Sequence, residues 1–276
     1  MSTSVHPRLI FVTGKGGVGK TSMALSLCLH LKQKGLEVKY NCFDQIPEHD
    51  ICRALEIDVL ELSHTKSAEA YIVKKLGSQT LARWVMKTPF FSALFSMLPG
   101  FGMMIVLGHI LDHLEQNPNL HLVVDSPSSG HALTMLESTH NFKEMFGKGK
   151  LVEDIGKMHA VLNDPSRVAM TIVSLPTEMA LQEGLELEKS IKELNFTNVK
   201  ILLNDIYHLS QELQGCHTEF IPSFLESKIA GEKEVSEQYK ESIFSRFPHI
   251  SKDSQVELVQ ELSTQWKEHE QQGGLI

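Results

Sequence analysis

The sequence predicts an α/β protein with a doubly wound, mostly parallel sheet and an inserted α-helical subdomain. Short apolar runs of strand length alternate with helical patterns along the chain, as in folds built from β-α-β units. One run, residues 120–125, is apolar enough for a strand buried on both faces. A glycine-rich loop joins the first run to the first helical pattern. Within the 276 residues we expect one domain over 1–276, with helical insertions at about 45–119 and 132–165.

The individual elements follow from periodicity and from the residues that stop helices. The first strand is expected at about 8–13, and the helix after it runs to Lys34, where Gly35 ends it. Further strands are expected at about 37–43, 120–125, 169–173 and 199–203, with a short one at 249–250. Further helices are expected at about 51–62, 67–87, 108–116, 132–162, 176 onward, 230–247 and 255–266.

The loop after the first strand reads Gly14-Lys15-Gly16-Gly17-Val18-Gly19-Lys20-Thr21. This is G-x-x-x-x-G-K-[ST] between a strand and a helix, which is typical of a phosphate-binding loop. Glycines let backbone N–H groups close around a phosphate, and the helix that begins near Thr21 adds the positive end of its dipole. Lys20 is placed to reach the β- and γ-phosphates, and the Thr21 hydroxyl to bind Mg²⁺. We therefore expect a P-loop NTPase fold that binds a nucleotide.

Polar residues end three of the expected strands, at the edge where open parallel sheets bind ligands. Asp125 follows Leu122-Val123-Val124, the Walker B arrangement, and is expected to hold Mg²⁺ directly or through a water; the alternative is a helix N-cap. Asp44 is a candidate to orient or deprotonate the attacking water, or else a turn-forming aspartate. Asn204 offers both a donor and an acceptor to an adenine edge. Its surroundings do not fit the Asn-Lys-x-Asp pattern of guanine readers, which favours ATP.

Residues 88–111 contain no Asp, Glu, Lys or Arg. A bilayer span needs about 20 apolar residues, so the length alone would suffice. The segment Pro99-Gly100-Phe101-Gly102 divides it into two helices that are too short to cross, and we expect no stable membrane insertion. Two interpretations stay open. The segment is either a helical hairpin buried against the sheet, or an exposed Met- and Phe-rich groove for an apolar client.

Composition sets further limits on partners and compartment. Lys plus Arg total 26 against 34 Asp plus Glu, and the resulting charge of −8 disfavours nucleic-acid binding. The N-terminal residues lack the pattern of a secretory signal. The four cysteines form no C-x-x-C pair: Cys28, Cys42, Cys52 and Cys216. We interpret them as free thiols of a cytoplasmic protein.

Two motifs carry a family resemblance. Lys15, directly after the first glycine, makes the loop G-K-G-G-x-G-K-T, which resembles the deviant Walker A class. Residues 125–131, Asp-Ser-Pro-Ser-Ser-Gly-His, resemble the D-x-P-x-x-G-H switch II of the arsenite/anion-pump ATPase (ArsA-like) family. That family also contains the targeting ATPase for tail-anchored membrane proteins. Weaker likenesses, including one to bacterial single-domain members, lie at residues 91–100, 130–136, 162–167 and 175–183. The resemblance covers about residues 9–204.

The resemblance implies a sandwich homodimer that uses ATP and Mg²⁺. Residues Gly14 through Thr21 would bind the triphosphate, and Lys15 would reach the phosphates bound by the partner subunit. Such a lysine would act like an arginine finger, adding positive charge where negative charge builds up during phosphoryl transfer. Asp125 would be the Mg²⁺-linked acid of switch II, and Gly130 would offer its N–H near the γ-phosphate. 

The resemblance further implies that Asp44 is the hydrolytic aspartate of switch I, acting with Lys15 and Lys20, and that Asn204 contacts adenine. The chain departs from the family where Asp44 is followed by Gln45-Ile46-Pro47 instead of Pro-Ala-His. The acid is kept but its turn is rebuilt, so the rate of hydrolysis is open. The paired zinc cysteines of the targeting ATPase are missing, and there is one P-loop where the arsenite pump subunit has two. We therefore do not expect a metalloid pump.

Three functions are compatible with these observations. The first is a soluble Mg²⁺-dependent ATPase that works as a dimeric switch and handles an apolar protein client or a partner complex. The second is a positioning ATPase of the MinD/ParA kind. The glutamates beside the apolar stripe of residues 256–266 weigh against a membrane-binding helix of that kind, because anionic lipid would repel them. The third is a nucleotide-binding adaptor with little or no hydrolysis.

Overall fold

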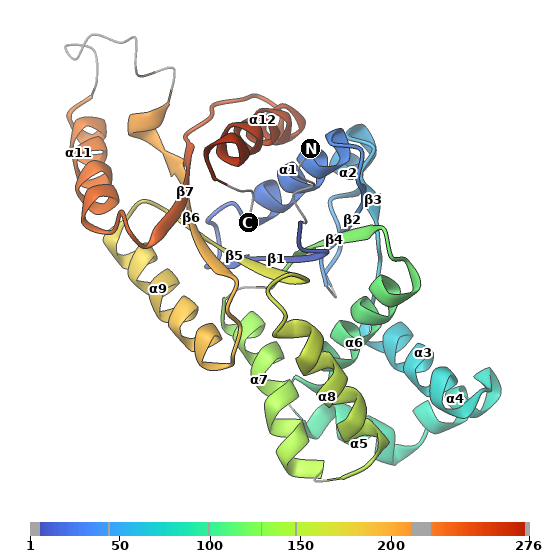
Figure 1. The fold of residues 1–276 in the computed structure, drawn as a ribbon. Helices are drawn as coiled ribbons and strands as arrows, with labels where there is room; N and C mark the ends of the chain where they lie inside the picture. Colours follow the sequence, from blue (N-terminus) through green and yellow to red (C-terminus); the bar gives the residue numbers. More distant parts are fainter. Residues whose placement is uncertain are drawn as a thin grey trace.

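The structure is a computed structural model that describes residues 6–43, 45–98, 100–127, 129–146, 148–210, 213 and 222–273. Within these residues, seven strands form one sheet in the order β3-β2-β4-β1-β5-β6-β7, and all neighbouring strands are parallel (Figure 1). The strands are β1 Leu9–Gly14, β2 Glu37–Asn41, β3 Asp58–Val59, β4 Leu120–Asp125, β5 Val168–Ser174, β6 Val199–Ile206 and β7 Ile243–Pro248. The predicted α/β fold with a parallel sheet is confirmed.

Successive side chains of the central strand enter different cores, because neighbouring residues of a strand point to opposite faces. Leu9 and Phe11 of β1 belong to one apolar cluster, and Ile10 and Val12 belong to another. Helices cover both faces (Figure 1). One face carries α1 Lys20–Gln33, α2 His49–Ala54 and α12 Gln255–Gly273, and the other carries α6 Phe101–Gln116, α7 Ser129–Phe146 and α9 Glu178–Glu193.

A group of helices extends away from the sheet (Figure 1). It comprises α3 His64–Leu76, α4 Gln79–Met86, α5 Pro89–Met97 and α8 Lys150–Leu162, together with the far ends of α6 and α7. This group has a small core of its own, in which Phe101, Phe142 and Ile155 are buried. The remaining elements, the 3₁₀ turn η1 Tyr207–Leu209 and the helix α11 Ser223–Gln238, lie beside β6 and β7.

The strand order creates the crevice in which doubly wound sheets bind ligands. The connection after β1 leads to one side of the sheet, and β5 lies on the other side of β1. At the carboxyl end, Val12 of β1 is paired with Asp125 of β4, and Gly14 with Val173 of β5. The glycine loop and the β4 carboxylate are therefore neighbours at the point where the winding reverses.

Several expected elements differ in the structure. The helix expected at 51–62 ends at Ala54, and the short strand β3 follows it, so the 45–119 insertion is not wholly helical. The helix expected at 67–87 is two helices, because Gly77 adopts φ 70° and ends α3. The helix expected at 230–247 ends at Gln238, and residues 243–248 form strand β7 instead of a strand at 249–250.

The apolar segment 88–111 is divided at Gly100, as the sequence predicted, into α5 and α6. Half of the 16 residues of α6 are buried, and α5 packs against the small core through Phe91 and Phe95. Two α5 side chains do not pack in this way: Phe90 and Met97 are each 75% exposed. Among the described residues, no helix is both long and apolar enough to cross a bilayer.

The C-terminal helix α12 lies against α1, the helix that follows the glycine loop (Figure 1). Its apolar stripe is buried there, with Val259 and Trp266 each 1% exposed. The Trp266 indole N–H donates to the Ser26 hydroxyl at 2.9 Å, and its ring meets Phe247 edge-on at 4.8 Å. This stripe therefore stabilises the nucleotide-side helix and is not a free surface in this structure.

Candidate functional site

Two glycines of the loop, Gly14 and Gly19, have no room for a side chain. A Cβ at Gly14, whose φ is 144°, would lie 2.2 Å from the Val173 carbonyl oxygen. Gly19 has φ 90°, and a Cβ there would lie 2.5 Å from the Asn204 side-chain nitrogen. Both positions require glycine because of their backbone conformation and because neighbouring atoms approach the backbone closely. The loop is therefore fixed between β5 and the end of β6.

Two hydroxyl groups converge on one oxygen of Asp125. The Thr21 hydroxyl donates to Asp125 Oδ2 at 2.7 Å, and the Tyr40 hydroxyl donates to the same oxygen at 3.0 Å. Thr21 lies in the first turn of α1, Tyr40 lies on β2, and Asp125 ends β4. Three neighbouring elements thus hold the carboxylate, which is only 4% exposed.

Burial sets the electrostatics of this carboxylate. It raises the pKa of Asp125 above its ordinary value, and the hydrogen bonds from Thr21 and Tyr40 and the charge of Lys20 oppose the shift. Burial likewise lowers the pKa of Lys20, and the Asp125 charge opposes that shift. Burial beside Asp125 raises the pKa of the Tyr40 phenol, so Tyr40 stays a hydrogen-bond donor at neutral pH.

Both lysines of the loop have partners in the same chain. Lys20 Nζ donates to the Lys15 carbonyl oxygen at 2.8 Å. Lys15 Nζ forms an ion pair with Glu183 Oε1 of α9 at 2.6 Å, with the two side chains 51% and 44% exposed. The Lys15 side chain therefore extends toward the surface that α9 of the same chain forms beside the loop.

Asn204 lies on the other side of the loop. Its side-chain nitrogen donates to the Val18 carbonyl oxygen at 2.9 Å, which ties the end of β6 to the glycine loop. A hollow of about 180 Å³ adjoins it, lined by the loop, the ends of β6 and β7, and α12. Such a hollow next to a phosphate-binding loop is where a nucleobase would lie.

Two further residues of the predicted site are Gly130 and Asp44. Gly130 is exposed in the first turn of α7, five residues beyond Asp125 in the chain. Asp44 lies outside the described residues. The structure therefore brings together the loop residues 14–21, Asp125 and Asn204, while the roles assigned to all of them stay predictions.

Sequence reasoning missed two residues of this site. Tyr40 belongs to an expected strand without an assigned role, and Glu183 only ends the weak family likeness at residues 175–183. The partners of Tyr40 and Glu183 are 85 and 168 residues away in the chain. The role of Tyr40 could have been inferred from the adjacency of β2 and β4, two parallel strands that both end near the loop.

The comparisons with known proteins agree with these observations. A sequence model described as "Anion-transporting ATPase" (ArsA ATPase) matches residues 7–151 and 138–265, most of the chain. The chain belongs to the anion-transporting ATPase family. The family resemblance predicted from the loop and from residues 125–131 is thus confirmed.

Several curated relatives are similar to this ArsA-family chain at low identity. It is 24% identical to "ATPase ARSA2" of Chlamydomonas reinhardtii over 58% of this chain and 45% of that protein. It is 22% identical to "ATPase GET3B" of Arabidopsis thaliana over 75% and 66%, respectively. It is 20% identical to the "Arsenical pump-driving ATPase" of Acidiphilium multivorum over 72% and 40%. The chain thus spans less than two thirds of the length of each of these relatives.

The ArsA-family site has the donors that suit Mg²⁺. The Thr21 hydroxyl and the Asp125 carboxylate are hard oxygen ligands 2.7 Å apart at the end of the loop. Mg²⁺ at nucleotide sites is held by one or two such groups together with phosphate oxygens and water. Among the described residues, no cluster of three or more His, Cys, Asp or Glu side chains could hold a metal ion alone. The donor set therefore fits a metal that arrives with a phosphate ligand.

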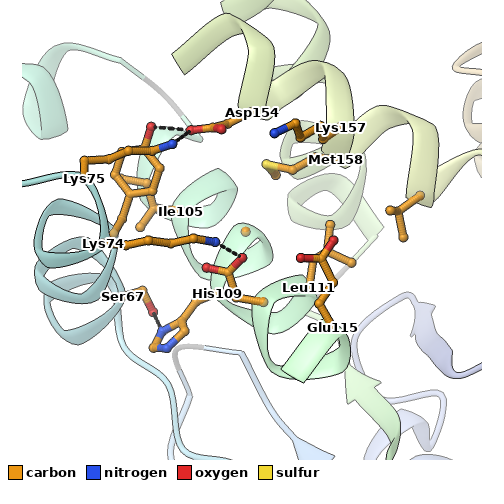
Figure 2. Close-up of a pocket in the computed structure, with 14 residues that line it drawn as sticks. Ser67, Lys74, Lys75, Ile105, His109, Leu111, Glu115, Asp154, Lys157 and Met158 are labelled. Atoms are coloured by element: carbon orange, nitrogen blue, oxygen red, sulfur yellow. Dashed lines mark hydrogen bonds and ion pairs between the residues drawn. The ribbon is translucent and has the colours of Figure 1, made fainter. Parts of the chain in front are cut away.

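A second cavity lies in the helical group, away from the loop (Figure 2). It has a volume of about 200 Å³ between α3, α6 and α8. Asp154 of α8 accepts hydrogen bonds from the Tyr71 hydroxyl at 3.0 Å and from Lys75 Nζ at 2.6 Å, both on α3. Lys74 pairs with Asp112 of α6 at 2.7 Å. These contacts join the three helices around the cavity.

Proposed function

We propose that this ArsA-family chain hydrolyses ATP with Mg²⁺ and works as a nucleotide-driven homodimeric switch. The observation that carries the proposal is the Thr21–Asp125 hydrogen bond at the end of a loop in which Gly14 has no room for a side chain. In a P-loop enzyme, these two groups lie where the metal and the terminal phosphates meet.

Each residue of the site would have a separate role in ATP binding and hydrolysis. The N–H groups of residues 14–21 would bind the β-phosphate, and Lys20 would exchange the Lys15 carbonyl oxygen for phosphate oxygens. Mg²⁺, when bound, would neutralise charge that develops on the phosphates. Tyr40 would keep Asp125 oriented toward Thr21 while the metal is held. Asp44 would position the attacking water, and Gly130 would offer its N–H near the γ-phosphate.

Dimerisation would complete the site. Lys15 would leave Glu183 and reach the phosphates bound by the partner subunit, adding positive charge during phosphoryl transfer. The ion pair that it would give up is half exposed, and exposed pairs contribute only about 0–1 kcal/mol, so the exchange costs little.

The helical insertions of this single domain would transmit the nucleotide state to a client. The helix α7 begins within the switch II residues 125–131, and α8 follows it toward the cavity of Figure 2. Exposed apolar side chains of the helical group, Trp84, Phe90 and Met97, are candidates to contact an apolar protein segment. The three free, buried cysteines among the described residues suit a reducing cytoplasm, and the −8 charge weighs against nucleic acid as partner.

The alternative of a membrane-positioning ATPase has less support. Such an enzyme needs an amphipathic C-terminal helix with a free apolar face. Here that face is buried against α1. The adaptor alternative, with little hydrolysis, differs from our proposal only in turnover and is tested with it.

The test is light scattering coupled to size-exclusion chromatography, with Mg²⁺ and a non-hydrolysable ATP analogue. Wild type should become a dimer, and Lys15→Ala should bind the analogue with a Kd within about threefold of wild type yet lose phosphate release from ATP. Lys252→Ala, which changes an exposed lysine outside the loop, should behave like wild type. A Lys15→Ala protein that hydrolyses ATP normally would refute the role of Lys15 in the partner's site. Wild type that binds the nucleotide but does not hydrolyse it would refute the ATPase and support the adaptor alternative.

A further inference from the structure

An interlocked set of side chains lies where β6 and β7 end. His249 Nδ1 is 2.6 Å from Asp205 Oδ1, so the protonated nitrogen donates to the carboxylate. The His249 ring stacks on the Tyr207 ring, with centroids 4.0 Å apart and an angle of 13° between the planes. Lys228 Nζ of α11 lies 3.6 Å from the centroid of the Tyr207 ring. Four side chains from β6, η1, α11 and the segment after β7 thus form one assembly.

The backbone at Asp205 has an uncommon conformation. Its φ is 63°, in the left-handed region that residues with a side chain rarely adopt. The pairing of β6 with β7 also shifts register between Leu203 and Ile206. Asn204 and Asp205 both border the hollow beside the glycine loop, although neighbouring residues of a regular strand would point to opposite faces. The irregularity at the end of β6 lets Asn204 contact the loop while Asp205 contacts His249. A conformation of this kind persists where surrounding contacts require it.

Asp205 itself and the sequence neighbours of the Asp205–His249 pair line the hollow beside the glycine loop. Asn204, Pro248 and Ile250 each border the hollow, and each is next in sequence to a member of the pair. The backbone supports the same junction, because the His249 N–H donates to the Ile206 carbonyl oxygen at 2.9 Å. The pair therefore sets the separation between the β6 wall and the β7 wall of the hollow.

We propose that Asp205 and His249 are positioning residues for the nucleobase. Their hydrogen bond holds Asn204 on one wall, and Pro248 and Ile250 on the other wall, of the hollow in which the base would lie. The proposal rests on the proposed function, because it assumes that the glycine loop binds the phosphates of the same nucleotide. Neither residue need touch the phosphates, so their effect is confined to the base.

The experiment compares a ligand with a base and a ligand without one. Calorimetry with the full chain and Mg²⁺ measures the Kd of ADP and of inorganic tripolyphosphate for wild type, His249→Leu and His249→Asn. His249→Leu should weaken ADP binding about tenfold, because the Asp205 carboxylate loses its hydrogen-bond donor, while tripolyphosphate binding stays unchanged. His249→Asn should restore ADP binding to within about threefold, because its amide N–H can replace Nδ1–H.

Two further variants guard against a fold defect. Asp205→Asn keeps a side chain that tolerates positive φ but removes the charge. This variant should weaken ADP binding by a few-fold. His121→Leu removes a histidine at the opposite end of the sheet, on β4, and should bind both ligands like wild type. With ATP, His249→Leu should raise KM and leave kcat within about twofold.

Distinct outcomes overturn distinct claims. Equal loss of ADP and tripolyphosphate binding in His249→Leu would assign the pair to fold stability and refute the positioning role. Unchanged ADP binding in His249→Leu, with wild type binding normally, would refute this inference alone. Wild type that binds neither ligand would refute the proposed nucleotide site itself.

Discussion

Lys15 and Glu183 form an ion pair of 2.6 Å within one protomer, between the glycine loop and helix α9. The proposed role of Lys15 in the partner's site requires this pair to open. Glu183→Gln removes the competing charge and should raise ATP hydrolysis by up to about fivefold at protein concentrations where dimers are scarce, since such pairs contribute about 0.2–1 kcal/mol. The free energy of unfolding should change by less than about 0.5 kcal/mol. A fall in hydrolysis would show that Glu183 assists the reaction and does not compete for Lys15.

Asp125 illustrates a conflict between stability and activity. Burial raises its pKa, so its ionised form is less favourable in the folded chain than in the unfolded chain. The stability that this group contributes is therefore present when it is protonated and is lost as the pH rises through the folded pKa. Asp125→Asn should stabilise the nucleotide-free protein by about 1 kcal/mol at pH 7 in urea unfolding, yet abolish Mg²⁺-dependent turnover. The matched change at an exposed position, Asp253→Asn, should alter neither property, and a destabilised Asp125→Asn protein would contradict this interpretation.

The seam between α1 and α12 should be sensitive to mild acid. His30 is buried against α12, with Nε2 3.3 Å from Glu270 Oε2, and burial lowers its pKa below 6.5 despite that carboxylate. A histidine whose folded pKa is lowered favours folding above the unfolded pKa and withdraws that support as the pH falls through the folded value. Wild type should therefore lose unfolding free energy between about pH 7 and 5. His30→Gln should lose less over this range, and an identical pH slope in the two proteins would contradict the assignment.

Asp154 joins helix α8 to helix α3 in the helical group. Although burial opposes ionisation, the hydrogen bonds from Lys75 and Tyr71 hold its pKa below the ordinary value, so its contribution to stability is present at neutral pH and lost in acid as the pH falls through the folded pKa. Asp154→Asn should cost about 1 kcal/mol in urea unfolding at pH 7. Under our proposal it should also reduce the nucleotide-dependent change in hydrogen exchange of α3. Asp112→Asn, which changes one ion pair between α3 and α6, is the matched control and should leave that exchange response intact.

The sequence predicted the fold where its patterns are local. Residues 120–125 form strand β4 with the expected bounds, because the apolar run Leu122-Val123-Val124 ends at the acidic Asp125. Strand β7 was not predicted, because residues 243–247 were assigned to the end of the helix expected at 230–247. Their true pattern alternates, with Ile243, Ser245 and Phe247 buried, and a serine in the buried register hides that alternation from a reading based on hydrophobicity.

In the site, too, local features could be predicted from the sequence and long-range contacts could not. The glycine loop could be recognised because its residues are consecutive, and Asp125 because it ends an apolar strand. The Tyr40–Asp125 and Lys15–Glu183 contacts join elements that become neighbours only through the strand order, which no local pattern specifies. The left-handed conformation of Asp205 likewise depends on the shifted register between β6 and β7.

The most direct measurement of ATP hydrolysis at the glycine loop is phosphate release by wild type, Lys20→Ala and the control Lys252→Ala, with and without Mg²⁺. We expect release from wild type and from the control, only with Mg²⁺, and a loss of at least about a hundredfold in Lys20→Ala, because Lys20 would neutralise charge on the phosphates that react. Equal release from Lys20→Ala and wild type would contradict the assignment of catalysis to this loop.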